Sequence, residues 1–186
     1  MSKKSENELS YYQLDKAKVH LQAAIDGIVC LQDTIDSEVI VRTFYLSGVL
    51  QQAIQNDDLA SQYFTIAISL QPDLQWDNYF APDALPLFEE AQKNFASNQE
   101  KELVIIPKRM QSNIWLNGVP LSAEETPMVH SGINIIQILG RNVETYFLDV
   151  SPNDPSPHLL IPEGIPDTAN TWVNAEEQRS ELNLLL

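Results

Sequence analysis

The hydrophobic residues of this chain change their spacing once, near residue 100, and this change constrains the fold more than any other feature. Before it, apolar residues recur every three or four positions, which is the period of an amphipathic helix. After it, short apolar runs alternate with turn residues such as Asn-Gly and Ser-Gly, which is typical of strands and hairpins. The polar stretch from Ala96 to Lys101 separates the two patterns. We therefore predict an α+β protein in which an all-α helical bundle precedes a small antiparallel β-sandwich.

The first domain is predicted to span residues 1–97 and to contain four helices. Asp36 or Ser37 can cap the second helix, because short polar side chains accept hydrogen bonds from the first free backbone N–H groups. Pro72 ends the third helix, because proline lacks a backbone N–H. The predicted ranges are about 8–32, 38–55, from the turn at 56–58 to Leu70, and from Pro82 to about Ser97.

The second domain is predicted to span residues 102–165 and to consist of short strands. Between the last two strands, the proline-rich segment 151–157 is expected to be an exposed loop, because proline cannot donate to a strand ladder. Residues 166–186 form a C-terminal tail with a possible short helix near its end. The predicted strands are Leu103–Ile106, Asn113–Leu116, Ile133–Leu139, Thr145–Val150 and His158–Ile161.

Composition limits the classes of partner. A chain of 186 residues with 44% hydrophobic residues can build a packed core, and its net charge of −15 disfavours nucleic acids and anionic membranes through repulsion. The same charge permits a basic protein partner, although simple solubility is the favoured explanation. Cys30 is the single cysteine, which excludes an intrachain disulfide, and its apolar neighbours predict that it is buried.

The sequence gives an ambiguous indication of compartment. No apolar segment approaches the roughly 20 residues that span a bilayer, so we expect no membrane insertion. No signal-peptide pattern is visible at residues 1–8. We expect the cell envelope or periplasm if a signal has been removed, and the cytoplasm otherwise.

The predicted second and third helices contain Gly48, Ala60, Phe64 and Ala67 and are closed by Pro72, a set of small and aromatic residues that resembles a tetratricopeptide repeat. Phe44, Ser47 and Gln51 depart from that pattern, and an ordinary helical hairpin is the alternative. The resemblance implies a groove that binds a peptide or partner domain. Its candidate contacts are Trp76, Tyr79 and Phe80 in the loop at 73–81, unless these rings fold inward and seal the end of the bundle.

The turn chemistry of the second half resembles a PEGA-like module, a small β-sandwich of bacterial and archaeal envelope proteins. The resemblance rests on segments 114–118, Thr126-Pro127 and Ser131-Gly132. It departs from the family before Trp115, where 107–112 lacks the four-residue motif that names it, while the similar segment 162–165 lies after the core strands. An unrelated sandwich with the same turns is the alternative.

Motifs for catalysis or cofactor binding are missing from the sequence. It contains no glycine-rich phosphate loop, zinc-protease motif or nucleophile elbow, and its histidines His20, His130 and His158 are far apart. We therefore expect a non-enzymatic protein without cofactor or metal.

The expected function is a scaffold or adaptor in a bacterial envelope-associated assembly, acting on a protein partner. One alternative is a cell-wall glycan-binding module in which Trp115 stacks on a sugar. The other is a cytoplasmic chaperone or regulator of a secretion or motility system. The identity of the partner and the oligomeric state stay open at this stage.

Overall fold

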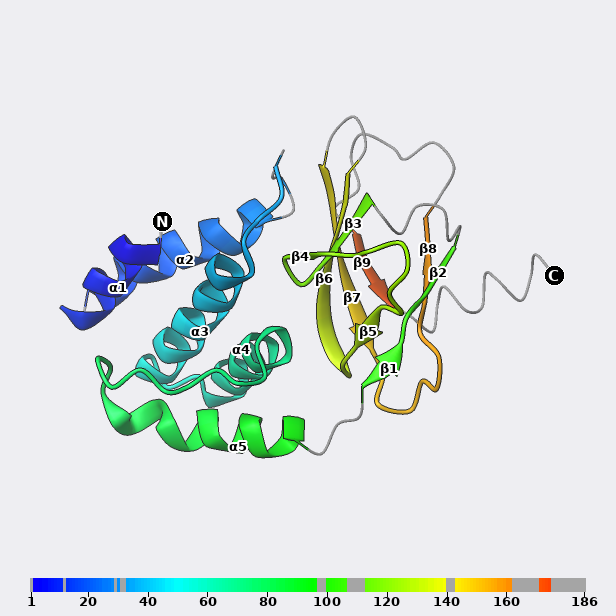
Figure 1. Ribbon diagram of the computed structural model, residues 1–186. Helices are drawn as coiled ribbons and strands as arrows, with labels where there is room; N and C mark the ends of the chain where they lie inside the picture. The colour runs from blue at the N-terminus through cyan, green and yellow to red at the C-terminus, as the bar shows by residue number, and fades with distance from the viewer. Residues whose placement is uncertain are drawn as a thin grey trace. The chain divides into compact units, whose positions relative to one another are not determined.

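Two units make up the chain in the computed structural model, which describes residues 2–11, 13–28, 30, 33–96, 100–106, 113–139, 143–161 and 171–174. The first unit comprises Met1–Ile28 and Asp36–Ser97, and the second comprises Val29–Ile35 and Asn98–Leu186. Figure 1 shows helices in the first unit and strands in the second. The predicted α+β class is therefore confirmed. The predicted first domain, residues 1–97, included the segment Val29–Ile35, which the structure groups with the strands instead.

Among the residues that the structure describes, five α-helices and one short 3₁₀ helix form the helical unit. The single helix predicted over 8–32 is wrong, because the chain breaks after Ser10 and restarts at Leu14. The Gln13 N–H donates to the carbonyl of Glu8 at 2.7 Å, which turns the chain between the two helices. The elements are α1 (Ser2–Ser10), α2 (Leu14–Ile28), α3 (Ser37–Ala53), α4 (Asp57–Leu70), η1 (Pro82–Ala84) and α5 (Leu85–Ala96).

Helix α3 is the central helix of this unit. It packs against α1, α2 and α4, and from Thr43 to Gln51 every residue is buried. The Asp36 side chain accepts a hydrogen bond from Glu38 N at 2.8 Å, so the predicted cap is confirmed. Asn56 caps α4 in the same way through Leu59 N. The two caps fix where the α3–α4 hairpin begins and turns.

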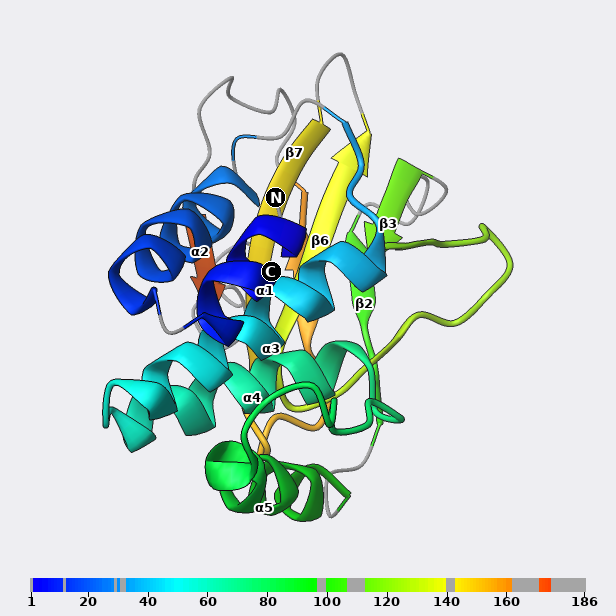
Figure 2. The same ribbon diagram turned by 90° about the vertical axis from the view of Figure 1, so that its left-hand side faces the viewer.

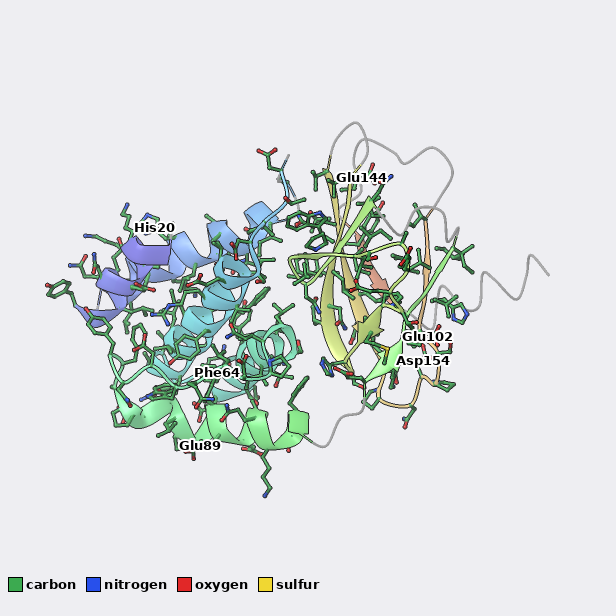
Figure 3. The ribbon with its side chains drawn as sticks, viewed as in Figure 1. His20, Phe64, Glu89, Glu102, Glu144 and Asp154 are labelled. Atoms are coloured by element: carbon green, nitrogen blue, oxygen red, sulfur yellow. The ribbon has the colours of Figure 1, made fainter. Side chains whose placement is uncertain are left out.

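Aromatic side chains fill the core of the helical unit. The rings of Tyr45, Phe64, Trp76 and Phe88 contact one another with centroids 5.6 to 6.3 Å apart. Phe64 lies in the interior among the helices (Figure 3). These spacings suit edge-on and tilted aromatic pairs, which contribute beyond their buried area. Helices α3, α4 and α5 and the loop after α4 thus share one aromatic core.

Gly48 allows α3 to approach α4 closely, and its replacement gives a direct test of this packing. A Cβ at Gly48 would lie 2.6 Å from Cδ1 and Cε1 of Phe64, whereas a Cβ at Gly27 of α2 would meet nothing within 4 Å. We expect Gly48→Ala to lower the free energy of unfolding by about 1–2 kcal/mol, because overpacking outweighs the gain in helix propensity. Gly27→Ala, the matched control, should raise it by up to about 1 kcal/mol. Chemical denaturation followed at 222 nm compares the two, and equal effects would contradict close packing at Gly48.

The described strands of the second unit form one five-stranded sheet and two pairs. The sheet has the order β4-β3-β6-β7-β9, while β1 pairs with β5 and β2 pairs with β8. Strands β6 and β7 run side by side along eight residues each (Figure 2). The strands are β1 (Lys101–Glu102), β2 (Val104–Ile106), β3 (Ile114–Leu116), β4 (Val119–Pro120), β5 (Met128–Val129), β6 (Gly132–Leu139), β7 (Val143–Val150), β8 (His158–Leu160) and β9 (Thr171–Asn174).

One face of the β6–β7 ribbon packs against the smaller strand pairs. Ile136 lies opposite Tyr146 in the register, and both belong to a buried cluster with Leu103, Ile105 and Leu159 from the region of β2 and β8. The main sheet is antiparallel from β4 to β7, as expected. The β2–β8 and β7–β9 pairings are parallel, which the sequence did not indicate. The predicted loop at 151–157 lies between β7 and β8, although Asp154 within it is buried.

A buried asparagine joins the predicted Asn-Gly turn to β6. Asn117 and Gly118 both have positive φ, 52° and 80°, as a two-residue hairpin turn requires. Asn117 Nδ2 donates to Asn134 Oδ1 at 3.1 Å, and Ile135 N donates to Asn117 Oδ1 at 2.7 Å. Asn134, which is fully buried, in turn donates from Nδ2 to the carbonyls of His130 and Gly132. The turn is therefore held to the next strand by side-chain amides.

The segment Val29–Ile35, which precedes α3 in the chain, belongs to the second unit and is joined to β6 through Gln137. Ile35 N donates to Gln137 Oε1 at 2.9 Å, and Gln137 Nε2 donates to Thr145 Oγ1 at 3.2 Å. Gln137 and Thr145 are both buried. These bonds satisfy polar groups that would otherwise be costly to bury.

Several remaining expectations concern Cys30 and the chain end. Cys30 is exposed, because α2 ends at Ile28 and the cysteine follows it in a turn, so the prediction that it is buried is wrong. None of the described helices is long and apolar enough to cross a membrane. Strand β9 lies within the predicted tail, and the possible helix near its end, like segments 107–112 and 162–165, lies outside the described residues.

Candidate functional site

A groove of about 580 Å³ opens on the helical unit at the C-terminal end of α3. One side is formed by the corner between α1 and α2, and the other by the segment that leads into η1. Most of its lining residues are apolar or aromatic, although polar atoms, including those of two glutamines and an aspartate, make up more than half of the surface exposed in it. Its lining residues are Leu9, Tyr11, Leu14, Val49, Gln52, Ala53, Gln55, Tyr79, Phe80, Ala81, Asp83 and Ala84.

The end of α3 shapes the floor of the groove. Ile54 N donates to the carbonyl of Leu50 at 3.1 Å, and Asn56 N donates to that of Gln51 at 2.9 Å. Gln55 between them has a positive φ of 61°, which turns the chain away from the helix. The turn leaves Gln52, Ala53 and Gln55 at the surface of the groove.

Asp77 organises the wall formed by the loop after α4. Its backbone N–H donates to Tyr45 Oη at 3.0 Å, and its Oδ1 accepts from Tyr79 N at 3.0 Å. Phe80 N donates to the Asp77 carbonyl at 3.1 Å. The resulting turn directs Phe80 into the unit, where it is buried, while Tyr79 stays 62% exposed.

Arg42 of α3 ties this loop to α1. Its Nη2 lies 2.7 Å from Asp77 Oδ2, and its Nε lies 2.6 Å from Glu6 Oε1. The guanidinium carbon also lies 5.3 Å from the ring centroid of Tyr45 and 5.6 Å from that of Phe80, within the range of a cation–π contact. Arg42 therefore holds both walls of the groove in place.

The electrostatics of this cluster keep its charges fixed at neutral pH. Burial acts to lower the pKa of Arg42, but its hydrogen bonds to Asp77 and Glu6 outweigh burial and raise it. Burial acts to raise the pKa of Asp77, but the bond from Arg42 keeps it below its usual value. Burial raises the pKa of Tyr45 to about 12, so its phenol stays protonated and accepts the Asp77 N–H.

The structure separates the four residues predicted to contact a partner. Trp76 belongs to the aromatic core, and Phe80 is buried beside Tyr45 while also lining the groove. Tyr79 is exposed at the rim of the groove. Trp115 lies in β3 of the other unit, half-buried between the core residues Ile114 and Leu116. The inward alternative applies to Trp76 and Phe80, and Tyr79 is the loop ring that is exposed to solvent.

Tyr11 is the groove residue that the sequence analysis missed. It is 73% exposed, more than any other large hydrophobic residue that the structure describes, and it lines the groove together with Tyr79. The predicted continuous helix over 8–32 placed Tyr11 at an ordinary helical position, so nothing marked it as a candidate contact. The break between α1 and α2 is what brings it to the rim.

Two histidines lie close to carboxylates of their own unit. His20 Nδ1 lies 2.7 Å from Glu8 Oε2, which joins α2 to α1, and Figure 3 labels His20 on this pair of helices. In the second unit, burial lowers the pKa of His130 more than the nearby carboxylate of Glu100, 3.5 Å away, raises it. Among the described residues, no three His, Cys, Asp or Glu side chains form a group that could hold a metal ion.

Comparison of the chain with protein-family models, with curated proteins and with solved structures yields no match. The resemblances to a tetratricopeptide repeat and to a PEGA-like module therefore stay predictions, and function has to be argued from the groove.

Proposed function

We propose that this protein is a non-enzymatic adaptor that binds a segment of a partner polypeptide in the groove of its helical unit. The observation that carries the proposal is the pairing of Tyr11 and Tyr79, the two exposed aromatic side chains among the described residues, on the rim of one groove. Tyrosine is enriched where binding energy concentrates at protein interfaces, because its ring buries a large area and its hydroxyl tolerates water.

The wall of the groove supports binding rather than catalysis. Of its described residues, Asp83 is the single carboxylate, and none is a histidine, cysteine, serine or lysine. A nucleophile with a base beside it, the minimal arrangement for covalent catalysis, is therefore not formed by these residues. Apolar side chains such as Leu9, Leu14 and Val49 can instead bury an aliphatic side chain of the partner.

A random peptide library displayed on phage tests the groove directly. We expect selection on the full chain to enrich peptides that lose binding at least about tenfold on a Tyr11→Ala/Tyr79→Ala variant, because hot-spot truncations cost more than about 1 kcal/mol each. Val19→Ala/Val39→Ala is the matched control, since both valines are exposed and lie outside the groove. Peptides that bind the tyrosine variant as well as the wild type would contradict the proposal.

The choice of variant follows from burial. Trp76→Ala or Phe80→Ala would remove core contacts with Tyr45 and so would mix loss of stability with loss of binding. The rings of Tyr11 and Tyr79 are largely in solvent, so their removal should leave the free energy of unfolding within about 0.5 kcal/mol.

The envelope-associated setting of this adaptor rests on the two resemblances alone. Cell fractionation of the tagged protein in its native host tests it: recovery with envelope fractions supports an envelope scaffold. Recovery in the cytosol would favour the chaperone or regulator of a secretion or motility system. A glycan-binding role for Trp115 is less favoured, because a half-buried indole offers only part of its face for stacking on a sugar.

A further inference from the structure

We infer that the segment bound in the groove is basic, with lysine or arginine side chains flanking an aliphatic anchor; this inference rests on the proposed function. Charge at the groove carries the argument. Asp83 is the one charged side chain among the described lining residues, and it forms no ion pair with any described residue. A cation entering the groove would find this carboxylate available.

Near the groove the backbone contributes partial charges of both signs, and the carboxylates of Asp57, Asp58 and Asp83 decide the net sign. The groove lies at the C-terminal end of α3, where the helix dipole places a partial negative charge. Asp57 and Asp58 open α4 just two and three residues after Gln55, which lines the groove. An anionic segment would be repelled here, and a cationic one attracted.

The cations of the helical unit do not compensate this field. The unit carries 13 Asp and Glu against six Lys and Arg. Arg42 is ion-paired with Glu6 and Asp77, so its charge is already balanced by theirs. None of the described lining residues is basic.

The tyrosines provide a second kind of contact for a cation. Arg42 already lies over the rings of Tyr45 and Phe80 inside the unit, which shows that aromatic faces here accept a guanidinium. The rings of Tyr11 and Tyr79 are exposed at the rim and can accept a partner's cation from solvent. The alkyl part of a lysine or arginine would then lie along Leu9 and Leu14.

Three fluorescein-labelled peptides with the same central leucines and arginine, glutamine or glutamate on either side test the inference. Fluorescence anisotropy with the full chain measures their affinities. At about 50 mM NaCl we expect the arginine peptide to bind at least about fivefold more tightly than the glutamine peptide, and the glutamate peptide most weakly. The difference should shrink at about 300 mM NaCl, where exposed charges are screened.

Two charge-matched variants localise the effect. Asp83→Asn should weaken binding of the arginine peptide about two- to fivefold, as expected for one exposed charge pair, and should leave the glutamine peptide unaffected. Asp73→Asn removes the same charge from an exposed residue outside the groove and should change neither. Equal losses for the two variants would show a diffuse charge effect and would overturn the inference.

The outcomes separate the inference from the proposed function. If arginine and glutamine peptides bind equally and Tyr79→Ala weakens both, the groove binds peptides without a preference for basic ones, so only the inference fails. If no peptide binds in a way that depends on Tyr79, both fail. Preference for the glutamate peptide would overturn the inference alone.

Discussion

Replacing Phe64 by alanine is expected to destabilise the helical unit by about 3–5 kcal/mol, the range for an aromatic side chain removed from a tight core. Phe64 is fully buried, and its ring contacts those of Tyr45, Trp76 and Phe88. The cavity would face rings that rotate little, so collapse around it should be limited. Since a small domain is stable by only about 5–15 kcal/mol, the loss is a large part of the total. Urea denaturation followed at 222 nm, where the helices dominate, measures it.

The same cavity gives a second, sharper measurement. Gly48 lies against Phe64, so Gly48→Ala should destabilise the wild type but stabilise the Phe64→Ala background, where the new methyl group enters empty space. Tyr79→Ala, which removes an exposed ring, should have almost no effect in either background. A cost below about 1 kcal/mol for Phe64→Ala, or the same sign for Gly48→Ala in both backgrounds, would contradict the packing described.

The second large effect is expected for Asn134→Asp in the β unit, with a loss of several kcal/mol at neutral pH. The Asn134 amide donates to two carbonyl oxygens, those of His130 and Gly132, and a carboxylate cannot donate. Its charge would also be fully buried, with no described cation among its hydrogen-bond partners. A charged group of this kind has a raised pKa in the folded protein.

The pH dependence of this variant follows from the direction of that shift. With its folded pKa raised above the unfolded value of about 3.9, the aspartic acid destabilises least below that pH and progressively more as the pH rises through the folded pKa. The difference between wild type and variant should therefore grow from pH 4 toward neutrality. Asn153→Asp, at an exposed position, should show almost no such trend. A difference that is constant with pH would mean that the carboxylate reaches water.

Helical and strand periods predicted the long elements well, because burial on one or two faces sets both the period and the fold. The apolar spacing of α3 and α4 and the runs at β6 and β7 lie where the structure has these elements. Helix α1 was missed because the sequence from Ser2 to Asn7 is polar, and its buried Ser5 becomes interior only through packing on α2 and α3.

Pairing between distant strands could not be predicted from local pattern. Strand β1 is two residues long and pairs with β5 across more than 20 positions, and β2 pairs with β8 across more than 50. A strand has the same alternation of side chains whether its neighbour is parallel or antiparallel, so the parallel β2–β8 and β7–β9 pairings left no mark on the sequence.

The candidate site was predicted in part. Aromatic residues in a polar loop indicated a surface, which is the position of Tyr79. Composition alone could not show that Tyr79 is exposed while Trp76 is packed in the core. That difference depends on the contacts of the Trp76 ring with Tyr45 and Phe88. The role of Asn134 could not be predicted either. A single asparagine in the apolar run 133–139 indicates only a strand, and nothing in the sequence shows that its side chain bonds to Asn117.

The membership of Val29–Ile35 in the second unit has a consequence for how the chain is made. During synthesis from the N-terminus, the helical unit is complete once Ser97 has emerged, yet the Ile35 N–H must wait for Gln137, some hundred residues later. If the gene were cut at the polar stretch near residue 97, the first fragment would contain the segment Val29–Ile35 without Gln137, the acceptor of the Ile35 N–H. The second piece would lack the donor to a buried amide. Each unit is therefore assembled from two separate stretches of sequence rather than from one.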